Sequence, residues 1–391
     1  GTSMAAPHAA GVAALMLAVE PALTPAEIEA QIKANAIPRN STHCPRPCGA
    51  GLLNAAFPLP AAGPEPVIVP VFYTTDRRVT YSATPQEWYG SMRGPLSYGR
   101  VEVTIPLDHR LGHLEAPSFW RFEFREDPSK HVVFFSLEVL PEQKFYRELR
   151  SRVAASPQDD AFVFIHGYNV SFEDAARRTG QIAYDLNFQG APILYSWPSR
   201  GELDDYPTDL NNAEWTVPHL QQFLSDLRER SGAQKIHLIA HSMGNKPLVS
   251  ALAAMVGDPD AGDAAVFNQV LLTAPDIDAD IFRTIAEQVV VAANRVTLYA
   301  SQRDKALQIA RQFHGLPRAG DASEGLVIVD GIDTIEASAV DTSLVGHSYY
   351  GDNRSVLSDI FAILKTQASP MERFGLRPAF YQGKRYWIFR P

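Results

Sequence analysis

The chain has 391 residues, of which 46% are hydrophobic and 20% charged. This length predicts one large domain with an appendage, or two domains, and the composition is typical of a folded protein with a sizeable core. Bulk disorder is therefore excluded. The 35 basic and 44 acidic side chains give a net charge of −9. Because the Lys and Arg residues are scattered, we expect no nucleic-acid partner.

Residues 1–57 predict two helices joined by a loop. The apolar stretch from Ala9 to Val19 is too short to cross a bilayer and no basic segment precedes it, so we expect no transmembrane segment. The second helix is expected to begin at Thr24, an N-cap followed by Pro25 and by Glu27 at the third helical position. Two helices and a loop cannot form a core by themselves.

The two cysteines, Cys44 and Cys48, lie in one Cys-Pro-Arg-Pro-Cys run. Two cysteines are too few for a zinc site without further ligands, and we expect no metal. A local disulfide is favoured over two free thiols, and it would indicate an oxidising compartment.

A proline-rich stretch separates this segment from the rest of the chain. Residues 55–70 contain five prolines, which predicts a linker at residues 58–66. Apolar strand-like runs then alternate with amphipathic helices, and this alternation predicts an α/β domain at residues 67–370, with a mostly parallel sheet covered by helices on both faces. The expected strands are residues 67–73, 101–105, 132–140, 161–165, 192–196, 235–240, 266–273, 296–300 and 326–329. A tail at residues 371–391 follows, in which Gln382-Gly383 predicts a hairpin.

The strongest chemical signal surrounds Ser242. The apolar run from Ile236 leads directly into Ala240-His241-Ser242-Met243-Gly244 and then into a predicted helix. A nucleophile elbow needs small residues two positions before and after its serine, because the strand and helix backbones approach closely there. Ala240 and Gly244 satisfy this requirement, so Ser242 is the predicted nucleophile.

An earlier strand end supplies candidates for an oxyanion hole. The run from Phe162 ends in His166-Gly167-Tyr168-Asn169, which lies before Ser242 as expected of an earlier strand–helix loop. The backbone N–H groups of Met243 and Tyr168 are the predicted donors, with Asn169 as the alternative to Tyr168. We assign His166 a role in shaping the loop and no proton transfer.

A base and an acid should follow Ser242 in the chain order serine, acid, histidine. His347 comes after the last predicted strand and before a helix, whereas His314 lies in a polar loop, so His347 is the favoured base. Asp304 and Asp276 each follow a strand. Asp276 stands among further aspartates and is expected to cap the next helix, so Asp304 is favoured as the acid.

Several motifs at about residues 67–365 resemble those of a bacterial α/β-hydrolase family of unknown function. Those motifs are Phe72-Tyr73-Thr74-Thr75-Asp76-Arg77, Tyr98-Gly99-Arg100, Val103-Thr104-Ile105-Pro106, Phe164-Ile165-His166-Gly167-Tyr168-Asn169, Tyr195-Ser196-Trp197-Pro198-Ser199 and Ala240-His241-Ser242-Met243-Gly244-Asn245. The resemblance implies an α/β-hydrolase fold and a serine hydrolase acting on carboxylic esters without metal or cofactor. It also implies that Ser242, Asp304 and His347 are the catalytic residues.

The first 57 residues resemble the C-terminal end of a subtilisin-like protease, through Gly1-Thr2-Ser3-Met4-Ala5-Ala6-Pro7-His8 and Cys48-Gly49-Ala50-Gly51-Leu52-Leu53-Asn54-Ala55. Ser3 would be the nucleophile of that family. The segments that would carry its acid, base and oxyanion donor are absent, so we expect Ser3 to be inert. Position 1 is not Met, which indicates a fragment, and the protease resemblance with the two cysteines favours an extracytoplasmic origin.

The favoured function is therefore a carboxylesterase acting on a small-molecule ester. Amide or thioester cleavage by the same triad is an alternative, as is a non-catalytic scaffolding or adhesion module. The insertions at residues 200–214 and 312–324 are polar and charged, whereas a lid over long acyl chains needs an apolar inner face. We therefore expect short acyl chains to be preferred.

Overall fold

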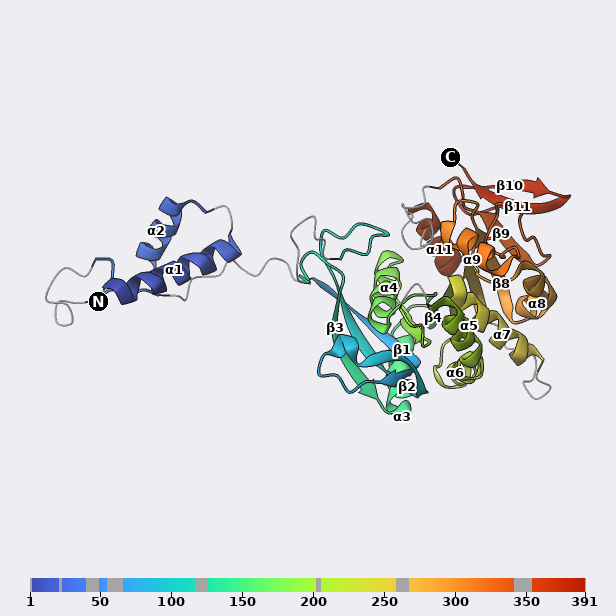
Figure 1. Ribbon diagram of the computed structural model, residues 1–391, viewed down its shortest axis with the longest axis horizontal. Helices are drawn as coiled ribbons and strands as arrows, with labels where there is room; N and C mark the ends of the chain where they lie inside the picture. The colour runs from blue at the N-terminus through green and yellow to red at the C-terminus, as the bar shows by residue number, and fades with distance from the viewer. Residues whose placement is uncertain are drawn as a thin grey trace. The chain divides into compact units, whose positions relative to one another are not determined.

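The computed structural model of the protein describes residues 2–20, 23–39, 49–54, 66–116, 126–201, 205–257, 267–340 and 354–390. Its chain divides into two compact units, Gly1–Glu65 and Pro66–Pro391 (Figure 1). Cys44, Cys48 and most of the predicted linker lie outside the described residues.

The first unit contains the two predicted helices, α1 (Thr2–Val19) and α2 (Pro25–Ala34). The expected cap of α2 is present, because Thr24 accepts a hydrogen bond from the Glu27 backbone and the Glu27 carboxylate accepts one from the Thr24 N–H. Across the described ranges, no helix is both long and apolar enough to cross a membrane.

The second unit is built on one sheet of eleven described strands, in the order β10-β11-β9-β8-β7-β6-β4-β5-β1-β2-β3. The strands are β1 (Val67–Val79), β2 (Tyr89–Ile105), β3 (Val133–Leu140), β4 (Asp160–Ile165), β5 (Ala191–Ser196), β6 (Lys235–His241), β7 (Phe267–Thr273), β8 (Ala293–Ala300), β9 (Ile332–Glu336), β10 (Leu376–Tyr381) and β11 (Lys384–Phe389). Every pairing from β1 through β5, β4, β6, β7, β8 and β9 to β11 is parallel. The β1–β2, β2–β3 and β10–β11 pairs are antiparallel.

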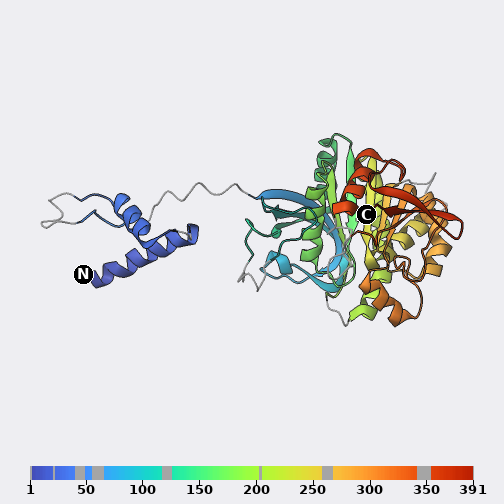
Figure 2. The ribbon, with the colours of Figure 1, turned by 90° about the horizontal axis from the view of Figure 1, so that it is seen from above.

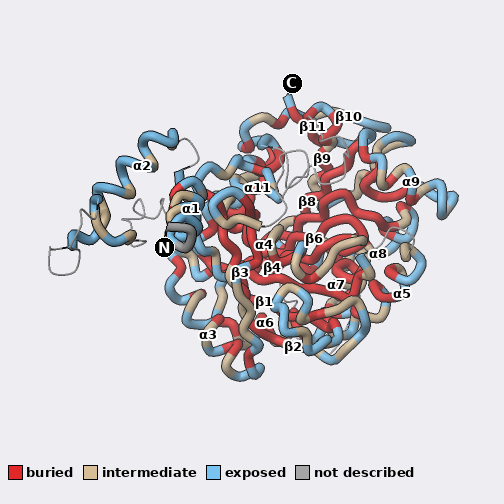
Figure 3. Tube along the Cα trace, turned by 60° about the vertical axis from the view of Figure 1, so that its left-hand side comes forward, coloured by how far each residue is buried: buried red, intermediate tan, exposed pale blue. Residues whose placement is uncertain are grey.

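Helices cover both faces of this sheet (Figure 2). They are α3 (Glu142–Ala154), α4 (Phe172–Asp185), α5 (Tyr206–Trp215), α6 (Val217–Arg230), α7 (Asn245–Val256), α8 (Ala279–Val291), α9 (Lys305–His314) and α11 (Arg354–Thr366). Alternate residues of β4 enter different cores, because side chains alternate along a strand. Val163 joins the cluster formed with α3, α6, α7 and α8, whereas Phe164 joins the cluster formed with α4 and α11. The central strands are buried (Figure 3). The predicted α/β class, a mostly parallel sheet with helices on both faces, is therefore confirmed.

One predicted strand is wrong. Residues 326–329 are not a strand, and β9 lies instead at Ile332–Glu336. The apolar run is explained by the core, since Val327 is 3% exposed and packs beneath the sheet. Gly331 then turns the chain with a φ of 86°, which a glycine adopts without strain, before β9 begins.

The hairpin predicted from Gln382-Gly383 is present. Both residues have positive φ, at 49° and 79°, and they connect β10 to β11. Because β11 pairs in parallel with β9, the hairpin extends the edge of the sheet rather than lying apart from it (Figure 1).

We expect the second unit to fold without the first. All described strands and both large buried clusters belong to residues after Pro66. The buried Val12 and Met16 of the first unit belong to neither cluster. A chain that begins at Glu65 should therefore be soluble and should melt within about 3 °C of the full chain, a shift equivalent to less than about 1 kcal/mol at this size. Circular dichroism checks this prediction, and an insoluble truncation would contradict it.

Candidate active site

Ser242 lies at the carboxyl end of β6, where the chain turns sharply into a helix. A single 3-10 turn, Ser242–Gly244, connects β6 to α7. Ser242 has a φ of 53°, a left-handed conformation that a serine adopts only under strain. The residue is 3% exposed. This strand–turn–helix geometry is that of a nucleophile elbow.

Two glycines allow the loop after β4 to pack directly against this turn. A Cβ atom added to Gly167 would lie 2.8 Å from the Cβ of Ser242, and one added to Gly244 would lie 2.2 Å from the carbonyl oxygen of His166. Neither position has room for a side chain. The loop that carries Tyr168, a predicted oxyanion donor, is therefore held beside Ser242.

The backbone of the turn is anchored from two directions. The Asn245 amide Nδ2 donates to the carbonyl oxygens of Ser242, at 2.9 Å, and of Thr273, at 3.1 Å. The backbone N–H of Asp276 donates to the same Ser242 carbonyl at 3.2 Å. Asn245 was not assigned a role from the sequence, although its place directly after the elbow glycine is a usable signal.

His166 supports the loop as a neutral side chain. Its Nδ1 donates to the Gly167 carbonyl at 2.8 Å, its ring stacks on Trp197, and Trp197 Nε1 donates to its carbonyl at 2.7 Å. Burial, with a smaller contribution from the Arg77 charge, lowers the pKa of His166 to about 3. The imidazole is therefore uncharged at neutral pH and available as an acceptor at Nε2.

Arg77, in β1, connects the loop after β4 with the end of β5 and the loop that follows it, a role that sequence reasoning missed. The buried guanidinium donates to Ser196 Oγ at 2.9 Å and to the carbonyls of Ser199 at 2.9 Å and Val170 at 2.7 Å. Its Nη2 lies 3.3 Å from His166 Nε2. Burial lowers the pKa of Arg77 to about 10, so the group remains charged at neutral pH. Only the tertiary structure brings these acceptors together.

We expect the buried histidines to make the protein acid-sensitive. Burial lowers the pKa of both His166 and His237 to about 3. An exposed histidine titrates near 6.5, so between these values the unfolded chain binds protons that the folded chain does not. The free energy of unfolding should therefore decrease as the pH falls from 6.5 to 3, by about 1.4 kcal/mol per pH unit for each group.

His237→Leu provides the test of this pH dependence. Among the described residues, neither ring nitrogen of His237 has a hydrogen-bond partner, so leucine should raise the melting temperature at pH 7. It should also make the loss of stability on acidification shallower. Thermal melts of both proteins from pH 7 to pH 4 measure this, and parallel curves would contradict the assignment to His237.

The two candidate acids have different surroundings. Asp304 is fully buried and caps α9, its Oδ1 accepting from the Leu307 N–H at 3.0 Å. Asp276 accepts from Arg318 Nε through Oδ1 at 2.7 Å and from the Tyr206 hydroxyl through Oδ2 at 2.6 Å. Arg318 is the ion-pair partner of Asp276, and both side chains are buried.

The expectation that Asp276 caps the following helix is wrong. Asp278 caps α8, with its Oδ1 accepting from the N–H groups of Asp280 at 2.9 Å and Ile281 at 3.0 Å. Asp276 is two residues too early in the chain, and its carboxylate turns inward to Arg318. Both oxygens of Asp276 are engaged by protein donors.

The remaining predicted residues are placed as follows. Met243 is fully buried within the turn, and Tyr168 directly follows Gly167. Asn169, the alternative donor, has a φ of 57°. His347 lies outside the described residues. The rival His314 ends α9, but its side chain lies outside what the structure describes.

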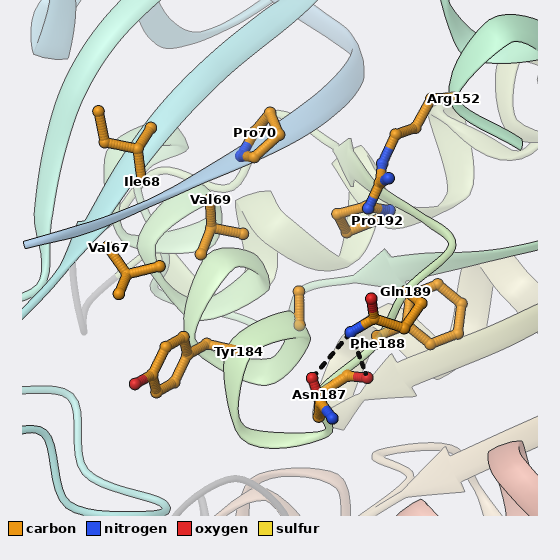
Figure 4. A pocket seen from close by; sticks show the side chains of 11 residues that line it. Val67, Ile68, Val69, Pro70, Arg152, Tyr184, Asn187, Phe188, Gln189 and Pro192 are labelled. Atoms are coloured by element: carbon orange, nitrogen blue, oxygen red, sulfur yellow. Dashed lines mark hydrogen bonds between the residues drawn. The ribbon is translucent and has the colours of Figure 1, made fainter. Parts of the chain in front are cut away.

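A cavity of about 540 Å³ lies elsewhere in the second unit (Figure 4). It is lined by the starts of β1 and β5, by the end of α4 with the chain that follows it, and by Arg152 of α3. In Figure 4, Val67 and Val69 point toward Tyr184, and Ile68 points the other way. The cavity lies at the amino ends of β1 and β5, whereas Ser242 follows the carboxyl end of β6. The cavity is therefore separate from the site.

In the described part of the chain, no cluster of three or more His, Cys, Asp or Glu is arranged to hold a metal.

Comparison with known proteins identifies the second unit. The family described as alpha/beta hydrolase of unknown function (DUF900) matches residues 141–366, more than half of the chain. The chain belongs to this family. The match begins just before α3 and ends at the last residue of α11, so it includes the elbow of the hydrolase and both candidate acids. Residues 1–51 match the subtilase family, and the predicted union of a subtilisin-like fragment with an α/β hydrolase is confirmed.

Two curated relatives match only short parts of the hydrolase chain. An extracellular protease of Xanthomonas campestris pv. campestris is 51% identical over 65 residues, covering 16% of this chain and 11% of the relative. An uncharacterized protein of Nostoc sp. is 38% identical over 53 residues, covering 14% of each. Among solved structures, a hyperthermophilic esterase from the archaeon Pyrobaculum calidifontis matches with a TM-score of 0.32 and 12% identity, over 78% of this chain and 84% of that one.

Proposed function

We propose that the hydrolase cleaves carboxylic esters through an acyl-enzyme formed on Ser242. The observation that carries this proposal is the strained, positive-φ Ser242 at the end of β6, packed against the Gly167 loop. Strain of this kind persists only where the surrounding structure imposes it, and we propose that here it serves to present the hydroxyl to the Met243 and Tyr168 backbone N–H groups.

The proposed reaction has two halves. Ser242 Oγ attacks the acyl carbonyl while His347 takes the hydroxyl proton, and His347 returns that proton to the departing alcohol. The Met243 and Tyr168 N–H groups donate to the oxyanion of each tetrahedral intermediate. Water then attacks the acyl-enzyme with the same proton transfers and releases the carboxylic acid.

Asp304 is the proposed partner of His347. It follows β8 and precedes β9, so the chain order of serine, acid and histidine is kept. Its bond to the Leu307 N–H fixes Oδ1 at the start of α9, where the helix dipole favours a carboxylate anion. A carboxylate held in this way can orient an imidazole and stabilise its protonated form.

A serine-reactive phosphonate tests this chemistry directly. We expect the probe to label the protein once, with the modified peptide containing Ser242, as read by mass spectrometry. Absence of labelling together with absence of ester hydrolysis would favour the non-catalytic scaffolding alternative.

Short acyl chains should be preferred. We expect kcat/KM for p-nitrophenyl butyrate to exceed that for the C12 ester by about 10-fold, because a long chain gains little without an enclosing apolar surface. A panel of p-nitrophenyl esters from C2 to C12 measures this preference. Faster turnover of the C12 ester would contradict it.

A further inference from the structure

Three aromatic side chains from separate segments form a continuous row. Tyr206, at the start of α5, packs edge-to-face on Tyr168, with ring centroids 5.2 Å apart. Its ring is nearly parallel to that of Phe313, near the end of α9, with centroids 6.4 Å apart and planes at 17°. We name Tyr168, Tyr206 and Phe313 the aromatic row. The two insertions expected to be polar therefore meet through aromatic rings.

One end of this row lies at Ser242. Tyr168 directly follows Gly167, where an added Cβ would lie 2.8 Å from the Cβ of Ser242. The Tyr206 hydroxyl donates to Asp276 at 2.6 Å, and the Asp276 N–H donates to the Ser242 carbonyl at 3.2 Å. Tyr168 therefore follows the glycine that packs on Ser242, and Tyr206 is linked to the elbow through Asp276.

The other end of the row is exposed. Phe313 is 78% exposed, and Ile309 and Leu316, four residues before it and three after it, are also exposed. The opposite side of α9 is the one that enters the core, through the buried Leu307 and Ala310. An exposed phenyl ring at the outer end of this row offers apolar area that a bound substrate can cover.

Two described arginines near the row are paired with carboxylates. Arg318 pairs with Asp276 at 2.7 Å, and Arg311 pairs with Asp321 at 3.3 Å and Glu324 at 3.1 Å. An uncharged group therefore suits this surface better than an ionic one. Because the hydrogen bond to Asp276 fixes the Tyr206 ring beforehand, binding loses little conformational entropy there.

We propose that the aromatic row binds an aryl group of the ester substrate, on either its acyl or its alcohol side. The exposed ring of Phe313 suits another flat ring, which gains stacking contact without being enclosed. A linear alkyl chain gains less there, because it leaves most of its own surface in water. This inference rests on the proposed function, since it names the substrate class of the same serine.

The test compares matched ester pairs with wild-type protein and Phe313→Ser. Benzyl acetate against ethyl acetate places the aryl group on the alcohol, and ethyl phenylacetate against ethyl butyrate places it on the acyl group. We expect Phe313→Ser to lower kcat/KM for at least one aryl ester by roughly 10-fold while changing the alkyl esters less than two-fold, which is the size of one aromatic contact. Cyclohexylmethyl acetate separates ring stacking from bulk, and its kcat/KM should fall less than that of benzyl acetate.

Two control variants sharpen the result. Phe374→Ser removes an equally exposed phenyl ring, 99% exposed, and should leave every ratio unchanged. Tyr206→Phe keeps the ring and loses the hydroxyl bond that fixes it, so the aryl preference should fall less than in Phe313→Ser. Equal losses for aryl and alkyl esters in Phe313→Ser, or no loss for either, would overturn the inference.

Binding of benzyl alcohol, followed by NMR saturation transfer, separates this inference from the proposed function. If no ester is hydrolysed but benzyl alcohol binds the wild type and not Phe313→Ser, the proposed function fails and the aryl site stands. If alkyl esters are hydrolysed but benzyl alcohol binds both proteins equally or neither protein, the aryl site fails and the function stands.

Discussion

Ser242→Ala should lower kcat/KM for ethyl acetate by about 10⁴-fold or more, since it removes the hydroxyl on which the proposed acyl-enzyme forms. The residual activity would come from the oxyanion donors and substrate binding alone. Ser3→Ala is the matched control and should change the rate less than two-fold, because Ser3 belongs to the first unit and every residue of the proposed triad belongs to the second. Initial rates with titrated protein measure both variants.

Stability provides a second readout for the same position. Ser242→Gly should abolish activity and raise the free energy of unfolding by about 1 kcal/mol, because glycine adopts a φ of 53° without strain. A destabilised Ser242→Gly would argue against stored strain at the elbow. An activity that depends on Ser3 would contradict the whole assignment of the nucleophile.

Asp304→Asn should lose activity and keep its stability, whereas Asp276→Asn should lose stability and keep most of its activity. Asparagine caps helices nearly as well as aspartate, so Asp304→Asn should melt within about 2 °C of wild type. Its kcat should nevertheless fall by about 10³- to 10⁴-fold, because an amide no longer holds the catalytic imidazole in the required tautomer.

Asp276→Asn removes the anion beside the buried Arg318 guanidinium. The uncompensated charge should cost about 3 kcal/mol of stability, whereas kcat at a temperature where the variant is folded should stay within about 10-fold of wild type. Thermal melts and kcat at 15 °C measure both quantities. If Asp276→Asn loses turnover while Asp304→Asn turns over normally, the acid follows β7 instead of β8.

Much of the fold could be predicted because its signals are local. Each central strand is a short apolar run, since a parallel strand covered on both faces has no polar side to alternate with, as in β4 and β6. The elbow could also be predicted, because the small residues around Ser242 are required by a backbone contact within one turn. The same local pattern wrongly predicted a strand at residues 326–329, where an apolar run contributes to the core without pairing as a strand.

The sequence by itself determined the hydrolase fold, the strand that ends in Ser242 and the loop that follows His166, because these depend on residues adjacent in the chain. Only the tertiary structure decided how the two aspartates differ, since Arg318 and Tyr206 reach Asp276 from segments 42 and 70 residues away. It also decided that Phe313 stacks on Tyr206. Such contacts depend on how separate segments pack, and no periodicity along the chain encodes them.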